Sequence, residues 1–192
     1  MTTTANPIPN SPWRPRNEIE ENPICLAKDS AEQIIPLLDR HLASFFVLFH
    51  QYQKHHWLVE GPQFRDLHHF LEAGYNEVHK QLDAVAERIT AIGGVPTSSP
   101  TNQEQLAYID HEPEGIFRIR DMLRRDRRAC GTIASELRDT IRVCTSEGDF
   151  GTETMLKGIL LQVEDRAHHI DHYLGNDSLG FEIAPDSKHA SG

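Results

Sequence analysis

The sequence predicts an all-α protein, a four-helix bundle with a short helix in its long middle connection. Four segments of similar length carry apolar residues every three to four positions, which is the period of an amphipathic helix. No segment shows the strict alternation of a half-buried strand. The connection over residues 95–114 is rich in Pro, Ser, Thr and Asn, and it is too long for a simple hairpin between neighbouring helices.

The first two helices are expected at residues 29–59 and 63–92. Asp29 or Ser30 is a suitable N-cap for the first helix, and Gly61-Pro62 separates the two. Gly93-Gly94 ends the second helix, as glycines do at helix C-termini. Further helices are expected at 115–146 and 152–174, with a short one near 103–109. Residues 1–28 contain five prolines and are expected to form an extended tail before a bundle over 29–175, and 176–192 a polar C-terminal tail.

The composition of the chain argues against several classes of protein. The 192 residues carry a formal net charge of −10 and contain twelve His and three widely spaced Cys. No apolar run is long enough for a membrane span, and the N-terminus lacks the pattern of a secretory signal. The cysteines form no disulfide framework, so a reducing cytoplasmic location is expected. The acidic balance argues against a surface built to neutralise phosphates and is compatible with attracting cations.

The second helix carries a polar stripe of alternating chemistry. His68, Glu72, His79, Asp83 and Glu87 follow one another at gaps of 4, 7, 4 and 4, all close to whole helical turns. One interpretation is a solvated helix face with i,i+4 pairs. The other is a metal site, because imidazole and carboxylate together suit iron.

Helix geometry sharpens the metal interpretation. His68 and Glu72 can share an ion with His56, which lies across the short Gly-Pro turn. Glu87 is roughly 28 Å from His68 along one helix, so these two cannot bind the same ion within one subunit. His68 and Glu87 could bind the same ion if two copies of the helix packed antiparallel about a two-fold axis near position 77 or 78. Asp83 and Glu87 would then come from the second subunit; otherwise the stripe is two unrelated surface pairs.

These residues resemble a known family, the Dps mini-ferritins (DNA-binding proteins from starved cells). The resemblance in motif covers about residues 56–94, and the helical layout extends it over about 30–175. The chain also lacks the Glu-x-x-His signature of ordinary ferritins. The motif reads His56-Trp57-x-x-x-Gly61-x-x-Phe64-x-x-x-His68-x-x-x-Glu72, then Asp83-x-x-Ala86-Glu87-Arg88 and Gly93-Gly94.

The resemblance implies a ferritin-like four-helix bundle that assembles into a hollow homododecamer. It implies cytoplasmic protection against oxidative stress, by oxidation of Fe(II) with hydrogen peroxide or O₂ at ferroxidase centres on the two-fold interfaces. The Fe(III) mineral would be stored inside. His56, His68 and Glu72 would be metal ligands from one subunit, and Asp83 and Glu87 from its mate. Trp57 matches the family's tryptophan beside the centre, and zinc is a possible occupant of the same site.

The chain departs from the family in its histidines and acids. Glu72 stands where the family often has Asp. His79 is either an additional ligand, as we predict, or an interface histidine hydrogen-bonded to its mate. His55 and His69 adjoin the expected ligands and are expected to be second-shell or surface groups, because neighbouring helix residues point about 100° apart. We expect polar packing or exposure, rather than metal binding, for a last group of histidines: His168, His169 and His172.

Two surfaces bear on iron uptake and DNA. The turn before the last helix matches the family segment at the three-fold pores, where Asp149 and Glu153 supply acids but Phe150 and Thr154 do not. The family members that bind DNA use basic tails, whereas both tails here nearly balance or are acidic. We therefore expect weak or absent DNA binding, with the arginines of 124–128 paired to Asp121 and Asp126 or similar neighbours. A non-enzymatic DNA-binding, nucleoid-protecting protein of the same fold is the alternative, and a structural bundle with incidental histidines a third.

Overall fold

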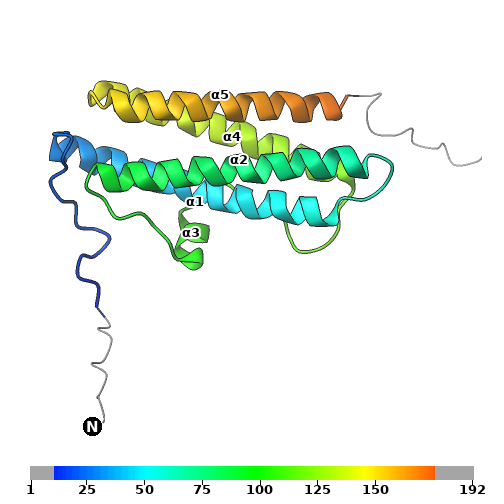
Figure 1. The fold of residues 1–192 in the computed structure, drawn as a ribbon, viewed down its shortest axis with the longest axis horizontal. Helices are drawn as coiled ribbons and strands as arrows, with labels where there is room; N and C mark the ends of the chain where they lie inside the picture. Colours follow the sequence, from blue (N-terminus) through cyan, green and yellow to red (C-terminus); the bar gives the residue numbers. More distant parts are fainter. Residues whose placement is uncertain (1–10, 176–192) are drawn as a thin grey trace, which may run out of the picture.

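Five α-helices make up the computed structural model, which describes residues 11–175 (Figure 1). No strand occurs in this range, so the predicted all-α class is confirmed. The bounds of the helices are α1 Lys28–Leu58, α2 Phe64–Ala91, α3 Pro100–Leu106, α4 Ile119–Ser146 and α5 Phe150–Tyr173.

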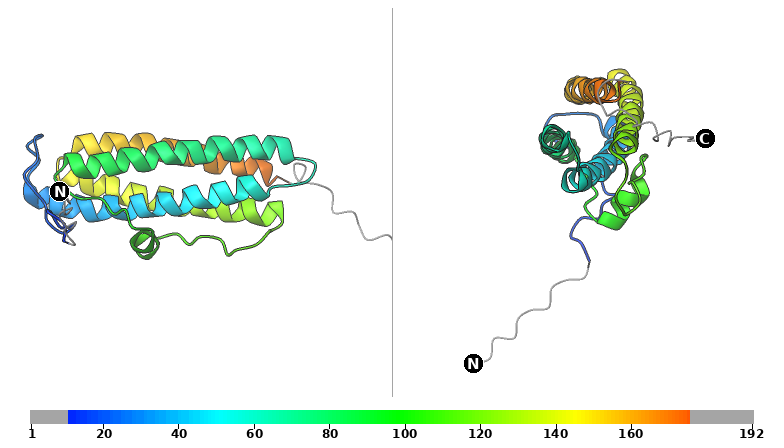
Figure 2. Two further views of the ribbon diagram at one scale, coloured as in Figure 1. Left: turned by 60° about the horizontal axis from the view of Figure 1, so that its bottom comes forward. Right: turned by 90° about the vertical axis from the view of Figure 1, so that its right-hand side faces the viewer.

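The four long helices form two antiparallel hairpins joined by one crossover. A short turn joins α1 to α2 and another joins α4 to α5, whereas the connection that holds α3 runs back along the bundle, so that α2 and α4 are parallel (Figures 1 and 2). The end-on view shows α3 outside the bundle, beside α1 (Figure 2). The predicted four-helix bundle with a short middle helix is thus confirmed.

Helix α1 begins at Lys28, so Ala27 is its N-cap and the expectation of Asp29 or Ser30 there is wrong. Two other helix starts differ by three or four residues for local reasons. The short helix begins three residues earlier than expected because Pro100 occupies its first turn, where a missing N–H costs nothing. Helix α4 begins at Ile119 rather than near Gly115. Gly115 has a φ of 123° and Arg118 is extended, so the chain is not yet helical there.

The core is a continuous apolar stripe along all four long helices, and Tyr52 is its largest fully buried side chain. The tyrosine hydroxyl lies 3.2 Å from the Cys130 sulfur, which ties α1 to α4 within the core. Other large side chains with almost no exposure include Ile34, Leu38, Leu42, Phe45, Leu48, Leu67, Leu71, Ile89, Ile92, Leu123 and Ile133.

The end of α2 is closed by glycine and by the N-terminal segment. The Gly94 N–H donates to the Ile89 carbonyl at 2.9 Å, and Gly93 has a φ of 93°, which is the glycine C-cap that the sequence predicts. A Cβ on Gly93 would lie 2.2 Å from the Glu20 carbonyl oxygen, so only glycine fits there. The Glu20 N–H in turn donates to the Gly93 carbonyl at 3.1 Å.

Residues 11–27 contain no helix or strand, yet they contact the bundle. Ile19 and Leu26 pack against the core, and Arg16 donates to the buried carboxylate of Asp39. The expected tails at 1–10 and 176–192 lie outside the described residues. Among the helices of the described range, none is long and apolar enough to cross a membrane.

Candidate metal centre

His56, near the end of α1, and His68, in the first turns of α2, stack on each other. Their ring centroids are 3.7 Å apart at an interplanar angle of 23°. The Nδ1 atom of His56 lies 2.9 Å from the His68 carbonyl oxygen, and the Nδ1 atom of His68 lies 2.9 Å from the His56 carbonyl oxygen. A carbonyl only accepts, so both Nδ1 atoms carry the proton and each Nε2 keeps the lone pair that a metal ion requires.

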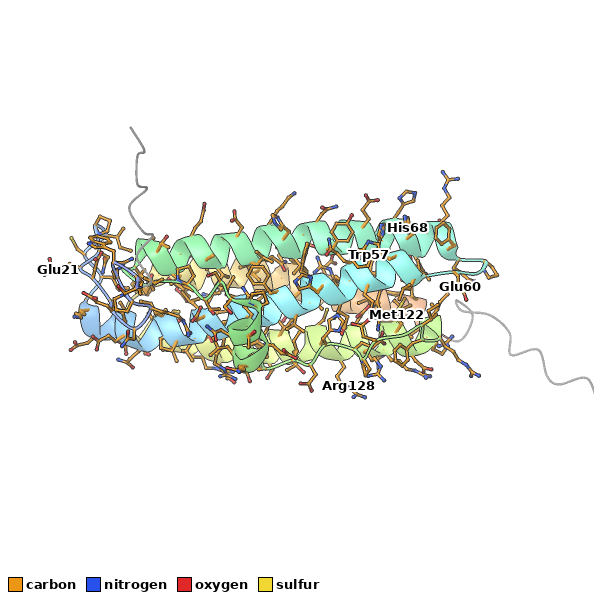
Figure 3. The ribbon with its side chains drawn as sticks, turned by 90° about the horizontal axis from the view of Figure 1, so that it is seen from below. Glu21, Trp57, Glu60, His68, Met122 and Arg128 are labelled. Carbon is orange, nitrogen blue, oxygen red and sulfur yellow. The ribbon has the colours of Figure 1, made fainter. Side chains whose placement is uncertain are left out.

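Aromatic rings flank the stacked pair. Phe64 packs against His68 with ring centroids 4.9 Å apart, and Tyr75 meets His56 edge-on at 5.3 Å. Trp57 is 67% exposed, and Figure 3 shows it on α1, whereas His68 lies on α2. The two imidazoles therefore sit on one outer face of the α1–α2 hairpin, half-buried among apolar rings.

The three carboxylates of the stripe lie along α2 at increasing distance from the histidine pair. Glu72 is one turn from His68, and its carboxylate is 3.6 Å from Nδ1 of the exposed His69. Asp83 and Glu87 are also exposed. Asp83 is eleven residues from Glu72 along one straight helix, a separation of roughly 16 Å. One chain thus brings His56 and His68 together, with Glu72 one turn along α2 and in contact with His69, and leaves Asp83 and Glu87 apart from them.

His79 lies between the two groups of the stripe. It is exposed, and its ring packs against Phe49 with centroids 5.7 Å apart. Within the described part of one chain, no three His, Cys, Asp or Glu side chains converge closely enough to hold a metal ion.

His55 is part of a buried charge cluster that the sequence did not reveal. Its Nδ1 is 2.8 Å from Asp126 and its Nε2 is 3.1 Å from Glu112, while Lys54 donates to Glu112 at 2.6 Å. Burial alone would lower the pKa of His55, but the charges and hydrogen bonds of Asp126 and Glu112 outweigh it and raise that pKa. We expected His55 either to contact the ligands or to lie on the surface. The surface alternative is wrong, because only 1% of His55 is exposed.

The cluster has a consequence for the candidate ligands. It fixes the rotation of α1 about its axis by anchoring one residue to α4 and to the crossover connection. His56 points about 100° away from His55 and therefore faces α2. No local signal could have identified Glu112 and Asp126 as partners, because they lie 57 and 71 residues from His55 in the chain.

The basic stretch of α4 is largely paired, as expected, but with partly different acids. Arg124 contacts Asp121 at 3.1 Å, whereas Arg125 contacts Glu112 at 3.3 Å and Arg127 contacts Asp171. Asp126 is fully buried and turned toward α1, so it is not available to the arginines.

The acids of the turn before α5 form contacts within the chain. Asp149 is buried, accepts the Thr152 N–H at 3.0 Å as the N-cap of α5, and pairs with Arg88. Glu153 accepts from Lys157 at 2.6 Å, and this bond, with a second from Thr145, lowers the pKa of its carboxyl group. Both acids that we expected to line a cation funnel are thus paired within the chain.

Comparison with known proteins agrees with this architecture. The family model "Ferritin-like domain" matches residues 35–179. The "DNA protection during starvation protein" of Halobacterium salinarum is 42% identical over 79% of this chain and 83% of its own. The "nutrient stress-induced DNA-binding protein" of a Synechococcus species is 42% identical over 85% of this chain and 93% of its own. An archaeal Dps homologue of known structure from Halobacterium salinarum superposes with a TM-score of 0.85, at 38% identity over 91% of this chain and 97% of that one.

A ferritin-like bundle with an imidazole pair at the α1–α2 hairpin therefore defines the class of the protein. The chain belongs to the Dps family, as the sequence motif indicated. Dps proteins in general oxidise and store iron and protect DNA.

Proposed function

We propose that the protein is a mini-ferritin that oxidises Fe(II) at centres shared between two subunits and stores the Fe(III) product inside a homododecamer. The observation that carries this proposal is the reciprocal bonding of His56 and His68. It holds two imidazoles side by side with each Nδ1 as the donor, so that Nε2 is the nitrogen left for a metal ion in each ring, before any metal arrives. Such preorganisation is typical of metal ligands, whose second ring nitrogen usually donates to a carbonyl or carboxylate.

In the proposed centre, His56, His68 and Glu72 bind iron together with Asp83 and Glu87 of a second subunit. Antiparallel packing of two α2 helices about a two-fold axis brings the separated halves of the stripe together. Carboxylates stabilise Fe(III), and imidazole suits both iron and zinc. His79 lies near this axis, and we propose it as an additional ligand.

The proposed reaction consumes Fe(II) and hydrogen peroxide together, the two reagents that otherwise generate hydroxyl radical. Two Fe(II) ions give one electron each to hydrogen peroxide, whose O–O bond breaks, and two protons complete two water molecules. Because both electrons are delivered at one centre, hydroxyl radical is not released. O₂ is the other possible oxidant, and the cytoplasm is the expected location.

A direct test compares Fe(II) oxidation in the wild type and in His56→Ala/His68→Ala. Fe(II) and hydrogen peroxide are mixed, and the Fe(III) absorbance is followed. We expect the double variant to lose the fast phase, and His69→Ala, which alters an exposed neighbour, to keep it. Size exclusion of the same samples tests the dodecamer. Equal rates in the double variant and the wild type would reject the proposed centre.

A second candidate function is DNA protection without enzymatic activity, which the names of the two relatives favour. The net charge of −10 per chain opposes it here. Tail composition and charge therefore favour iron chemistry over DNA binding for this chain.

A further inference from the structure

The last turns of α5 carry a second histidine group, far along the chain from the candidate centre. His168 and His172 are exposed and lie one helical turn apart. This end of α5 lies beside the start of α2, where the Phe70 and Tyr173 rings approach to 5.2 Å between centroids (Figure 1). We propose that His168 and His172 form a two-histidine clamp that binds one divalent transition-metal ion at a site separate from the candidate centre.

The separation of the two imidazoles carries the proposal. The Nε2 atoms of His168 and His172 are 3.1 Å apart, with ring centroids at 4.4 Å and planes at 80°. Metal–imidazole bonds are about 2.0–2.1 Å long, so one ion can reach both nitrogens with an N–metal–N angle of about 100°. That angle lies between the octahedral and tetrahedral values, so neither ring has to move far. The sequence alone gave no such distance; both histidines are exposed, as expected, and the proposal of metal binding goes beyond that expectation.

The spacing has a chemical precedent in helices. Two histidines at i and i+4 on one helix face are the pair that binds zinc in His-Glu-x-x-His helices. In the absence of metal, the 3.1 Å contact requires that one Nε2–H donates to the other Nε2. A bound ion takes the Nε2 lone pair of each ring, and the proton of the donor ring moves through solvent to that ring's own Nδ1. Water can occupy the remaining coordination positions, so the ion stays exchangeable.

His169 provides a matched control within the same group. It adjoins His168 but points about 100° away, and its Nδ1 lies 3.8 Å from Asp165 on its own helix. It also lines a surface hollow together with Phe70, Tyr173 and His172, but its own ring takes a different direction from the clamp. It is therefore an exposed histidine of the same helix that takes no part in the clamp.

The test uses Cu²⁺, because copper binds imidazole more tightly than the other divalent first-row ions. The full-length assembled protein carries His56→Ala/His68→Ala as background, so that the interface imidazoles do not compete and failure of the proposed ferroxidase centre leaves the result unaffected. Cu²⁺ is titrated in, its affinity is measured by calorimetry, and the number of coordinated nitrogens is read from the electron paramagnetic resonance spectrum.

We expect the tightest Cu²⁺ to show two imidazole nitrogens in this background. His172→Ala should weaken that site by at least about tenfold and remove one nitrogen coupling, and His168→Ala should do the same. His172→Gln, which keeps the side-chain volume, controls for packing and should behave like His172→Ala. His169→Ala should change neither quantity. Unchanged Cu²⁺ binding in His172→Ala, or an equal loss in His169→Ala, would overturn the clamp.

Discussion

The Nδ1 atoms of His56 and His68 each lie 2.9 Å from the other residue's carbonyl oxygen. This reciprocal pair joins the end of α1 to the start of α2 and selects the same tautomer in both rings. The backbone therefore orients the two proposed metal-binding nitrogens without any contribution from a neighbouring carboxylate.

The first prediction concerns zinc. Zn²⁺ uses the same imidazole and carboxylate ligands as iron but cannot change its oxidation state. Addition of Zn²⁺ before Fe(II) should therefore slow the fast phase of Fe(III) formation, and a chelator should restore it. Ca²⁺, which prefers oxygen ligands, serves as the control and should have little effect. Fast oxidation that persists in the zinc-loaded protein would show that iron reacts elsewhere.

The second prediction separates the two interpretations of His79. If His79 is an iron ligand, His79→Gln should lower the oxidation rate per assembled subunit several-fold while the dodecamer elutes normally. A ligand lost from a metal site weakens metal binding without removing the apolar contacts of the interface. A weakened assembly with an unchanged rate per assembled subunit would instead favour the interface role.

The third prediction concerns stability against acid. His41 is buried, with its ring nitrogens 2.6 Å from the Tyr108 hydroxyl and 2.8 Å from the Thr140 hydroxyl. Burial, followed by the nearby Arg40 charge, lowers the pKa of His41 from 6.5 to about 3. The folded pKa is below the unfolded value, so the unfolded chain takes up the proton first. The contribution of neutral His41 to the free energy of unfolding is therefore fully present above pH 6.5 and is lost as the pH falls toward 3.

This contribution amounts to about 1.4 kcal/mol per pH unit per chain within that window. The urea midpoint of the wild type should decline below pH 6.5, and that of His41→Gln should decline less steeply. The comparison is made between pH 5 and 7, above the range in which most carboxylates titrate. Parallel pH profiles for the two proteins would show that His41 is not the group that is protonated.

The fourth prediction concerns DNA. At −10 per chain, twelve copies carry about −120, and phosphate binding depends on positive charge. Several arginines of α4 are also paired with acids in the same chain. The assembled protein should leave duplex DNA unretarded on a gel at physiological salt and neutral pH. A retarded band under those conditions would reassign the chain to DNA binding.

Periodicity and the glycines at helix ends were sufficient to predict the helices to within a few residues. The exceptions were the starts of α3 and α4, where Pro100 and the backbone of Gly115 decide the boundary. The ligand candidates from α1 and the start of α2 could be paired because only a short turn separates them in sequence. Their separation from Asp83 and Glu87 followed from helix rise alone.

Contacts between distant parts of the chain could not be predicted. The sequence shows His55 only as a neighbour of His56, whereas its burial depends on carboxylates from the crossover connection and from α4. Asp149 likewise matched a funnel position by sequence, but it forms an ion pair with Arg88 of α2 and caps the N-terminus of α5. In both cases a charged residue that appears available in the sequence is neutralised by tertiary packing.

The most direct test of the shared centre mixes two inactive variants. His56→Ala/His68→Ala and Asp83→Ala/Glu87→Ala are coexpressed, so that dodecamers contain both kinds of subunit. If each centre takes its histidines from one subunit and Asp83 and Glu87 from its two-fold mate, random pairing leaves about a quarter of the centres complete, and ferroxidase activity should return to that level. Mixed assemblies as inactive as either variant alone would contradict a centre shared between subunits.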